Sequence, residues 1–242
     1  MKGRSELNTL VIETSTSIEL LAVSADGRIS DRTAVPGVSH SVTLFSNLDA
    51  ALVALGIGIR DIGLIGVGVG PGSFTGIRIA VSTARMLAQA LGVPLVPVMS
   101  QLFYAVSVTA SPGEYVLAAF DAKKGRVFGA LYRAGDDPLA PSELVPPGDY
   151  DIALLCEKTL GARTIAVGDG CDRYRDRIGD MVPGCEIRGG FIPSGGTACR
   201  LVDKLYAENP DRFEDIMAVL PYYARKSDAE VLRETGNGPG RG

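Results

Sequence analysis

A glycine-rich segment from Gly70 to Arg78 separates an apolar run, residues 64–69, from a helix-forming run, residues 77–91. Its glycines permit positive φ and close backbone approach, and Ser73 and Thr75 can accept hydrogen bonds from the amides that open the helix. A strand-to-helix elbow of this kind can bind a phosphate group. Because neither Gly-x-Gly-x-x-Gly nor Gly-Lys-Ser/Thr is completed here, we interpret the segment as a structural elbow, with a nucleotide cradle as the alternative.

The helix predicted after the elbow is apolar on two sides. Successive residues of a helix lie about 100° apart around its axis, so the apolar residues can be assigned to faces. One apolar face is enough to cover a sheet, and this helix has a second one, which consists of Ile79, Met86 and Ala90. A helix that is apolar on two sides must also be covered on both. Either another helix of this chain or a second protein could supply the additional cover.

The preceding helix, predicted for residues 39–55, has an outer side of small, uncharged residues. Asp49 is the only charged residue in this segment, whereas solvent-exposed helix faces are usually rich in Lys and Glu. The outer sides of the two helices together predict an interface to which another protein contributes matching helices. The predicted interface residues are Ser46, Ala50, Val53, Ile79, Met86 and Ala90. The stripe that docks the first helix on its own sheet is predicted to be Leu44, Phe45, Leu48, Ala51, Leu52 and Leu55.

The composition is that of a globular chain with an acidic balance. Its 242 residues carry a formal net charge of −4, and the isoelectric point is about 5.1. This length allows one large domain or two small ones. The acidic balance argues against a large phosphate-binding surface formed by this chain alone, so a nucleic acid would need a partner protein to hold it.

The cysteines and the one histidine do not form a metal-binding pattern. Cys156, Cys171, Cys185 and Cys199 include no Cys-x-x-Cys pair, and His40 is the only histidine. We expect four free, buried thiols, no metal site, and a capping or hydrogen-bonding role for the histidine at a helix start. Charged residues near the N-terminus and the lack of an 18-residue apolar run predict a cytoplasmic protein without a membrane segment.

The order of the predicted elements favours an α/β fold in two halves, each beginning with a strand-turn-strand unit. We place the first half at residues 1–110, the second at 111–220 and a tail at 221–242, whose end we expect to be disordered. The predicted strands are 9–14, 19–24, 28–34, 64–69, 94–98, 114–121, 126–132 and 164–167. The predicted helices are 39–55, 77–91, 101–109, 151–160, 197–207 and 227–233, with an irregular Pro-rich loop at 136–149.

Five segments follow one another along nearly the whole chain: Glu13 to Thr16, His40, Gly70 to Arg78, Phe120 to Phe128 and Pro221 to Arg225. Together they resemble the TsaB (YeaZ) family. The resemblance implies an actin-like ATPase fold of the ribonuclease-H type, with mixed sheets flanked by helices. It also implies a role in making threonylcarbamoyladenosine in bacterial tRNA, where TsaC supplies the activated threonylcarbamoyl group, TsaD transfers it and TsaE is an ATPase. In that system TsaB is the non-catalytic scaffold, which pairs with TsaD through its two N-terminal helices.

This sequence departs from the catalytic relatives at two positions. They carry a His-x-x-x-His metal pair on the first helix, whereas here Leu44 follows His40 by one turn. Actin-like ATPases usually end the first strand with Asp, and this chain has Glu13. We therefore expect no catalytic residue, no metal and no cofactor beyond weak contacts with ATP or ADP. The residues that could make such contacts are Glu13, Thr14, Ser15 and Asp121.

Two other classes of function remain open. An actin-like phosphotransferase could use Glu13 and Asp121 around magnesium and ATP, and a glycoprotease-like peptidase is a further alternative. The peptidase has less support, because the sequence contains no visible nucleophile-base pair. These two enzymes form the first class. The second class is a self-contained homodimer, in which the two helix faces of the isolated chain pair with themselves.

Overall fold

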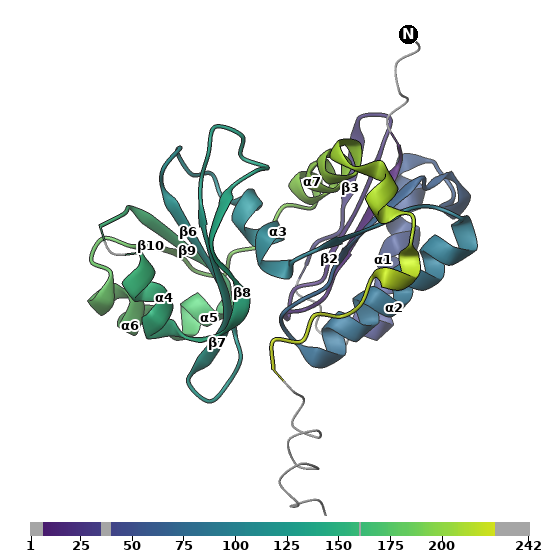
Figure 1. The fold of residues 1–242 in the computed structure, drawn as a ribbon. Coiled ribbons are helices and arrows are strands. Elements are labelled where there is room, and N and C mark those ends of the chain that lie inside the picture. Colours follow the sequence, from purple (N-terminus) through teal and green to yellow (C-terminus); the bar gives the residue numbers. More distant parts are fainter. Residues whose placement is uncertain (1–6, 35–39, 160, 226–242) are drawn as a thin grey trace, which may run out of the picture.

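The computed structural model describes residues 7–34, 40–159 and 161–225, except the side chains of residues 40 and 41, and contains two five-stranded mixed sheets (Figure 1). The order of the first sheet is β3-β2-β1-β4-β5, and the order of the second is β10-β9-β6-β7-β8. The strands of the first sheet are β1 (Thr9–Glu13), β2 (Leu20–Ala25), β3 (Arg28–Asp31), β4 (Leu64–Gly68) and β5 (Leu95–Val98). Those of the second are β6 (Tyr115–Asp121), β7 (Arg126–Arg133), β8 (Ser142–Asp151), β9 (Thr164–Val167) and β10 (Glu186–Arg188).

The two sheets repeat one topology. In the first, β1 pairs antiparallel with β2 and parallel with β4, and in the second, β6 pairs antiparallel with β7 and parallel with β9. The remaining strands also occupy equivalent places in the two sheets. This repetition confirms the α/β fold of two halves with mixed sheets, of the ribonuclease-H type, that we expected.

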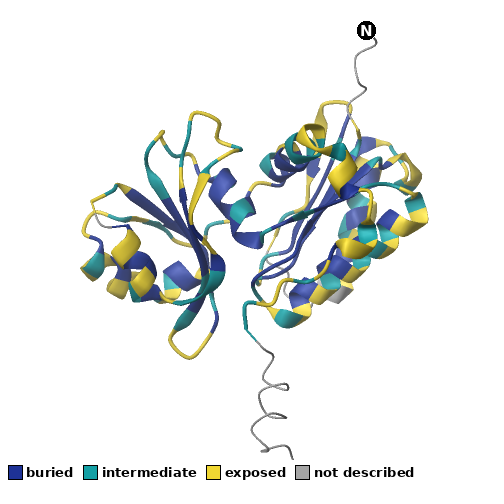
Figure 2. Cartoon of the chain, viewed as in Figure 1, coloured by how far each residue is buried: buried dark blue, intermediate teal, exposed yellow. Residues whose placement is uncertain are grey.

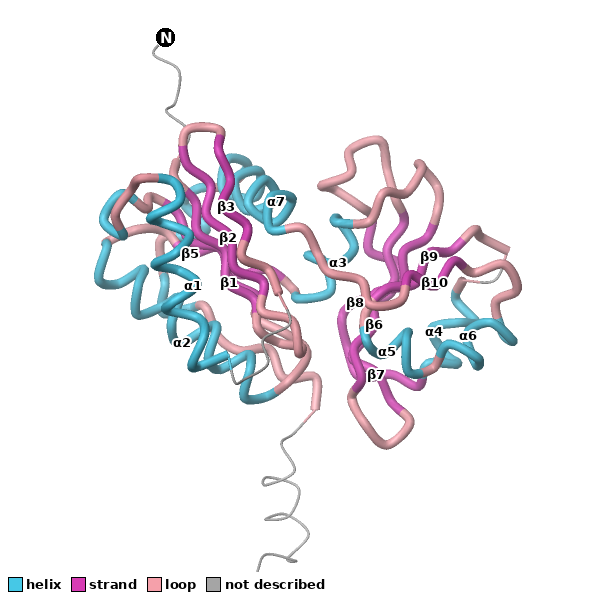
Figure 3. Tube along the Cα trace, turned by 180° about the vertical axis from the view of Figure 1, so that it is seen from behind, coloured by secondary structure: helices cyan, strands magenta, loops and turns pink. Residues whose placement is uncertain are grey.

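Helices cover both faces of each sheet (Figures 1 and 3). In the first sheet, Leu10 and Ile12 of β1 face α1 and α2, whereas Val11 faces α3 and α7, as the period of two in a strand requires. On the second sheet, α4, α5 and α6 pack against one face. The helices are α1 (His40–Leu55), α2 (Phe74–Leu91), α3 (Ser100–Ser107), α4 (Ile152–Lys158), α5 (Asp169–Arg173), α6 (Arg175–Met181) and α7 (Gly195–Glu208). Three short 3-10 helices, η1 (Ile59–Asp61), η2 (Pro210–Phe213) and η3 (Ile216–Ala218), complete the described elements.

Helix α3 lies between the two halves and is buried on both sides. Its Phe103 packs into the core of the first sheet, while Tyr104 packs into the core of the second. The chain enters the second half after α3 and returns after β10, so that α7 covers the first sheet. Residues 195–208 therefore pack with the first half, although they fall within the range 111–220 that we expected to form the second.

The Pro-rich segment 136–149, predicted to be an irregular loop, instead contains most of β8. This strand lies at the edge of its sheet, and its pairing with β7 is irregular on either side of Leu131. Prolines are compatible with edge strands and bulges because no ladder hydrogen bond is required there. Pro146 and Pro147 lie in the gap of the register, between the pairs Gly129–Gly148 and Leu131–Val145.

Other differences from the predicted elements concern short segments and one side chain. Helices α5 and α6 and strand β10 were not predicted, because elements of three to seven residues carry too little periodicity. Phe45, predicted to dock α1 on the sheet, is 52% exposed. The helix predicted at 227–233 and the disorder predicted at 236–242 lie outside the described residues.

Candidate functional site

Exposed residues follow the outer face of α1 and α2 (Figure 2), and several of them are apolar. Val53 is 71% exposed and Met86 is 52% exposed, although both are large apolar residues. Of the six predicted interface residues, Ser46, Val53, Met86 and Ala90 are exposed, and Ala50 and Ile79 are half-buried. Exposed apolar residues gathered on neighbouring elements are typical of protein-binding surfaces.

A shallow groove of about 500 Å³ separates α1 from the first turns of α2. Phe45, the side chain whose burial was predicted wrongly, lines this groove with Phe74 and Ile79. The groove extends the outer face toward the elbow. Its polar lining comes from Thr75, Arg78, Ser82 and Thr83.

The elbow before α2 interlocks with the loop that follows β1. Thr14 donates from Oγ1 to the carbonyl of Gly76 at 2.8 Å, and the amide of Ser73 donates to the carbonyl of Ser15 at 2.6 Å. A Cβ atom at Gly76 would lie 1.9 Å from the Thr14 carbonyl oxygen, and one at Gly72 would lie 2.5 Å from that of Ser15. The glycines are therefore required by contact between two loops of this chain, which supports the structural interpretation of the elbow.

Glu13 is buried and turned toward the protein interior. Its carboxylate accepts hydrogen bonds from the amide of Ser15 and from the hydroxyl of Ser100, and it lies directly over Gly68. The Ser100 hydroxyl oxygen in turn accepts a hydrogen bond from the Gly70 amide at 3.0 Å. Glu13 thus ties β1, β4 and the elbow to α3, and it does not line the pocket described below.

We expect Glu13→Ala to destabilise the chain by about 2–3 kcal/mol, because two buried donors, the Ser15 amide and the Ser100 hydroxyl, would lose their acceptor. Urea unfolding of the wild type and the variant measures this difference. Glu186→Ala is a suitable control, since the Glu186 carboxylate is exposed and pairs with the neighbouring Arg188 at the surface. Equal unfolding midpoints for Glu13→Ala and the wild type would contradict a structural role for the carboxylate.

A pocket of about 500 Å³ opens between the two halves. Ser15 and Asp121 line it, whereas the other two candidates for nucleotide contacts, Glu13 and Thr14, do not. The Ser15 hydroxyl is buried and has no hydrogen-bond partner among the described residues. Besides these, the lining includes Thr16, Ser17, Gly72, Ser73, Phe74, Phe120, Ala122, Lys123, Phe128, Asp169 and Tyr222 to Arg225.

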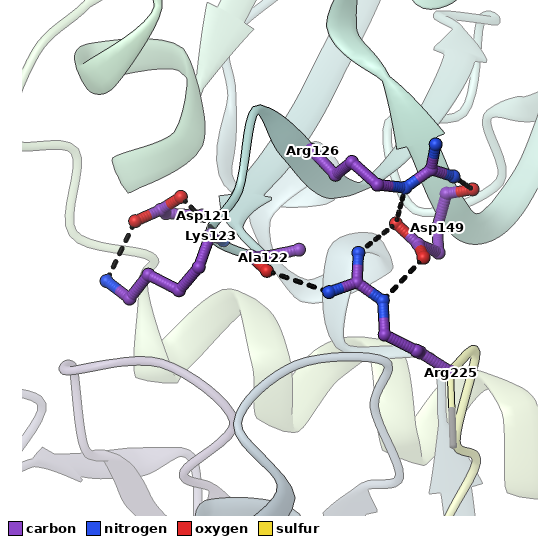
Figure 4. A network of polar contacts seen from close by, with 6 residues as sticks. All are labelled: Asp121, Ala122, Lys123, Arg126, Asp149 and Arg225. Atoms are coloured by element: carbon purple, nitrogen blue, oxygen red, sulfur yellow. Dashed lines mark hydrogen bonds and ion pairs between the residues drawn. The ribbon is translucent and has the colours of Figure 1, made fainter. Parts of the chain in front are cut away.

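Asp121 shapes the hairpin turn at the edge of this pocket (Figure 4). Its carboxylate accepts from the Lys123 amide at 2.9 Å and pairs with Lys123 Nζ at 2.8 Å. Burial raises the pKa of Asp121, but hydrogen bonds and charge from Lys123 and Arg173 outweigh it, so the pKa is lowered. Burial and the neighbouring Asp121 charge raise the pKa of Asp169. The arrangement accounts for Asp121 as a turn-forming residue.

A second polar network lies next to this turn and joins the C-terminal segment to β8 (Figure 4). Arg225 donates from Nε and Nη2 to the two carboxylate oxygens of Asp149, at 2.8 and 2.9 Å, and Arg126 donates from Nε to the same carboxylate at 2.7 Å. Arg225 also donates from Nη1 to the carbonyl of Ala122 at 3.1 Å. No pattern in the sequence indicates this network, because Asp149 stands at the end of the segment predicted to be a loop and its partner is 76 residues away.

All four cysteines are free thiols, and three of them are buried, while Cys185 is half-buried. Burial raises the pKa of Cys185 to about 11 and that of Cys199 to about 12, which keeps both thiols protonated and unreactive. Among the described residues, no group of three or more His, Cys, Asp or Glu side chains is placed to hold a metal ion. Within the same ranges, the helices are too short or too polar to cross a bilayer.

Comparison with known proteins points to one group of relatives. A family model described as "TsaD: tRNA N6-adenosine threonylcarbamoyltransferase" matches residues 35–147. The Escherichia coli protein named tRNA threonylcarbamoyladenosine biosynthesis protein TsaB is 30% identical over 175 residues, which cover 70% of this chain and 74% of that protein. The Bacillus subtilis protein of the same name is 26% identical over 237 residues, covering 93% and 97% of the two chains.

A solved structure shares the fold over most of the chain. YeaZ from Pseudomonas aeruginosa superimposes with a TM-score of 0.74 at 22% identity, covering 90% of this chain and 99% of that one. The likeness extends over both halves, because a match of this coverage must include both sheets.

Proposed function

Because the chain belongs to the TsaB family, we propose that it takes part in the biosynthesis of threonylcarbamoyladenosine in tRNA, as the non-catalytic subunit that pairs with TsaD. The observation that carries the proposal is the exposed apolar face of α1 and α2, which includes Val53 and Met86. This face is continuous with the groove lined by Phe45. A partner that contributes two similar helices would bury these side chains together as a four-helix contact.

The environment of Glu13 supports a non-catalytic role. A phosphotransferase of this fold would need a carboxylate at the end of β1 that faces the pocket, whereas Glu13 accepts hydrogen bonds from Ser15 and Ser100 and is not among the residues that line the pocket. Asp121, the second carboxylate of that alternative, is engaged by Lys123 and Arg173. The peptidase alternative gains no support from the cysteines, because burial raises the pKa of the Cys185 and Cys199 thiols and keeps them protonated.

Contacts with ATP or ADP would be weak and would involve only part of the predicted set. Ser15 and Asp121 border the pocket between the halves, so they are the residues that a nucleotide there could reach. We propose no resident cofactor. The tRNA would be bound through the assembled complex, with TsaE as a further member, because the acidic balance of this chain does not favour binding to phosphates. A complex of this kind works in the cytoplasm.

Mass measurement of the chain with and without TsaD tests the proposal. In the mixture we expect a stable one-to-one heterodimer. The chain alone should be either a monomer or a homodimer, and added TsaD should dissociate such a homodimer. The isolated chain should show no magnesium-dependent ATP turnover. A turnover that disappears in Asp121→Ala would favour the phosphotransferase alternative, and failure to bind TsaD would remove the scaffold interpretation.

A further inference from the structure

The C-terminal segment Pro221 to Arg225, here termed the strap, crosses from the first half to the second (Figure 1). It leaves the first half after η3 and ends beside the hairpin turn of β6 and β7. Four of its five residues, Tyr222 to Arg225, line the pocket between the halves. The strap therefore forms one wall of that pocket.

The first part of the strap is fixed to the first half by three kinds of contact. The Tyr222 amide donates to the Val69 carbonyl at 2.7 Å, which extends the backbone pairing of the elbow. The ring of Tyr223 stacks on that of Phe74, with centroids 4.6 Å apart. The guanidinium carbon of Arg78 lies 3.8 Å from the centroid of the Phe74 ring, and Arg78 Nε donates to the Tyr223 hydroxyl at 2.8 Å. The strap is thereby anchored to the elbow and to the first turns of α2.

The strap is fixed to the second half by the Arg225 side chain and by a longer hydrogen bond, 3.4 Å, from the Tyr222 hydroxyl to the Pro147 carbonyl of β8. Arg225 makes a two-point contact with the Asp149 carboxylate on β8 and a third hydrogen bond to the Ala122 carbonyl. Arg126 on β7 holds the same carboxylate from the other side (Figure 4). A two-point contact of this type is stronger and more directional than a single hydrogen bond between neutral groups.

The ion pair is ionised at neutral pH and only partly exposed to water. Burial raises the pKa of Asp149, but hydrogen bonds from Arg225 and Arg126 outweigh it and hold that pKa below its ordinary value. The Asp149 side chain is 13% exposed and the Arg225 side chain 28%. Salt therefore screens this pair less than it screens a fully exposed one.

The two halves are also joined away from the strap, around α3. The buried Gln101 donates from Nε2 to the Pro71 carbonyl of the elbow at 3.0 Å and to the Phe128 carbonyl of β7 at 3.1 Å. The hydroxyl groups of Tyr104 and Thr16 form a hydrogen bond of 3.0 Å, and the Tyr104 ring packs on that of Phe120 with centroids 4.7 Å apart. These buried contacts, together with the two chain crossings, form the permanent junction between the halves.

We propose that the strap is a latch that sets the angle between the halves and hence the width of the pocket. The Tyr222 amide and the Tyr223 ring hold the strap on the first half. Arg225 engages and releases the second half at Asp149 and Ala122, and the longer contact of the Tyr222 hydroxyl with Pro147 is made and lost together with it. Rotation about the junction at α3 moves the hairpin of β6 and β7 away from the elbow only after this contact is broken. The latch does not depend on the proposed role in tRNA modification.

The test is a distance measurement between spin labels on the two halves. Cysteines introduced at the exposed Arg60 and Leu154 carry the labels, in a chain whose half-buried Cys185 is replaced by serine. In Arg225→Gln we expect a changed mean distance and a broader distribution than in the parent chain, with unchanged circular dichroism. Asp149→Asn should shift the distance in the same direction.

Arg163→Gln is the matched control, because it breaks an ion pair with Glu114 within the second half. This variant should leave the distance distribution unchanged. Identical distributions for the parent chain, Arg225→Gln and Asp149→Asn would overturn the proposal. If Arg225→Gln lost its native circular dichroism, the partly conservative Arg225→Lys would decide, since a lysine cannot form the two-point contact and should still broaden the distribution.

Discussion

Met86→Glu should abolish the pairing of this chain with TsaD while leaving its own fold intact. Met86 is 52% exposed and lies on the outer face of α2, away from the buried residues Ile77, Ala80 and Ala84 that dock the helix on the sheet. In the free chain a glutamate at this position would be solvated. In the complex it would be buried without a partner, which costs about 3–5 kcal/mol, or more than 100-fold in affinity.

Leu154→Glu provides the matched control for this prediction. Leu154 is also a large apolar helix residue and is 45% exposed, but it lies on α4 in the second half. Its replacement should leave the affinity for TsaD unchanged, and Val53→Glu on α1 should weaken it as Met86→Glu does. Titration calorimetry measures all three variants. Wild-type affinity for Met86→Glu and Val53→Glu would exclude this face as the interface.

Gly76→Ala should strongly destabilise the chain, although alanine is the better helix former. An added Cβ would lie 1.9 Å from the backbone carbonyl oxygen of Thr14, and a backbone atom cannot move aside without displacing the end of β1. Helix propensity favours alanine by about 1 kcal/mol, whereas overpacking of this severity costs about 3 kcal/mol or more. We therefore expect a net loss of at least about 2 kcal/mol in the free energy of unfolding.

Gly179→Ala on α6 is the control, because no atom outside the neighbouring residues and the backbone of its own helix lies within 4 Å of the added Cβ. This substitution should be neutral or stabilise the chain by up to about 1 kcal/mol, through helix propensity alone. Urea unfolding of both variants provides the comparison. If the two glycine variants had equal stability, the contact between the elbow and the loop after β1 would not be what requires glycine at position 76.

The repeated topology and the long elements were accessible from sequence because each carries a clear period. Strand β1 is a buried apolar run, and α2 shows a 3.6-residue pattern over 18 residues. Strand β8 was missed since its prolines and charges resemble a loop, and only the edge position and the register gap explain how they fit. Phe45 was assigned inward because it stands next to the docking stripe of α1, whereas the groove beside α2 leaves it exposed.

The candidate site was predictable only in its residue types. Glu13 follows the apolar core of β1 in sequence, but no local pattern indicates that its carboxylate turns toward Ser100, 87 residues away. The contact between Arg225 and Asp149 likewise depends on how the two halves meet. Sequence periodicity reports the burial of a helix or strand face, whereas hydrogen bonds between distant elements depend on the assembled fold.

Reconstituted formation of threonylcarbamoyladenosine on tRNA, with TsaC, TsaD and TsaE and with or without this chain, tests the central claim most directly. We predict that modification requires the chain, that Asp121→Ala supports it at the wild-type level, and that Met86→Glu fails to support it. Equal modification without the chain would contradict a role in the complex. Loss of modification in Asp121→Ala, while the variant still binds TsaD, would contradict the non-catalytic assignment.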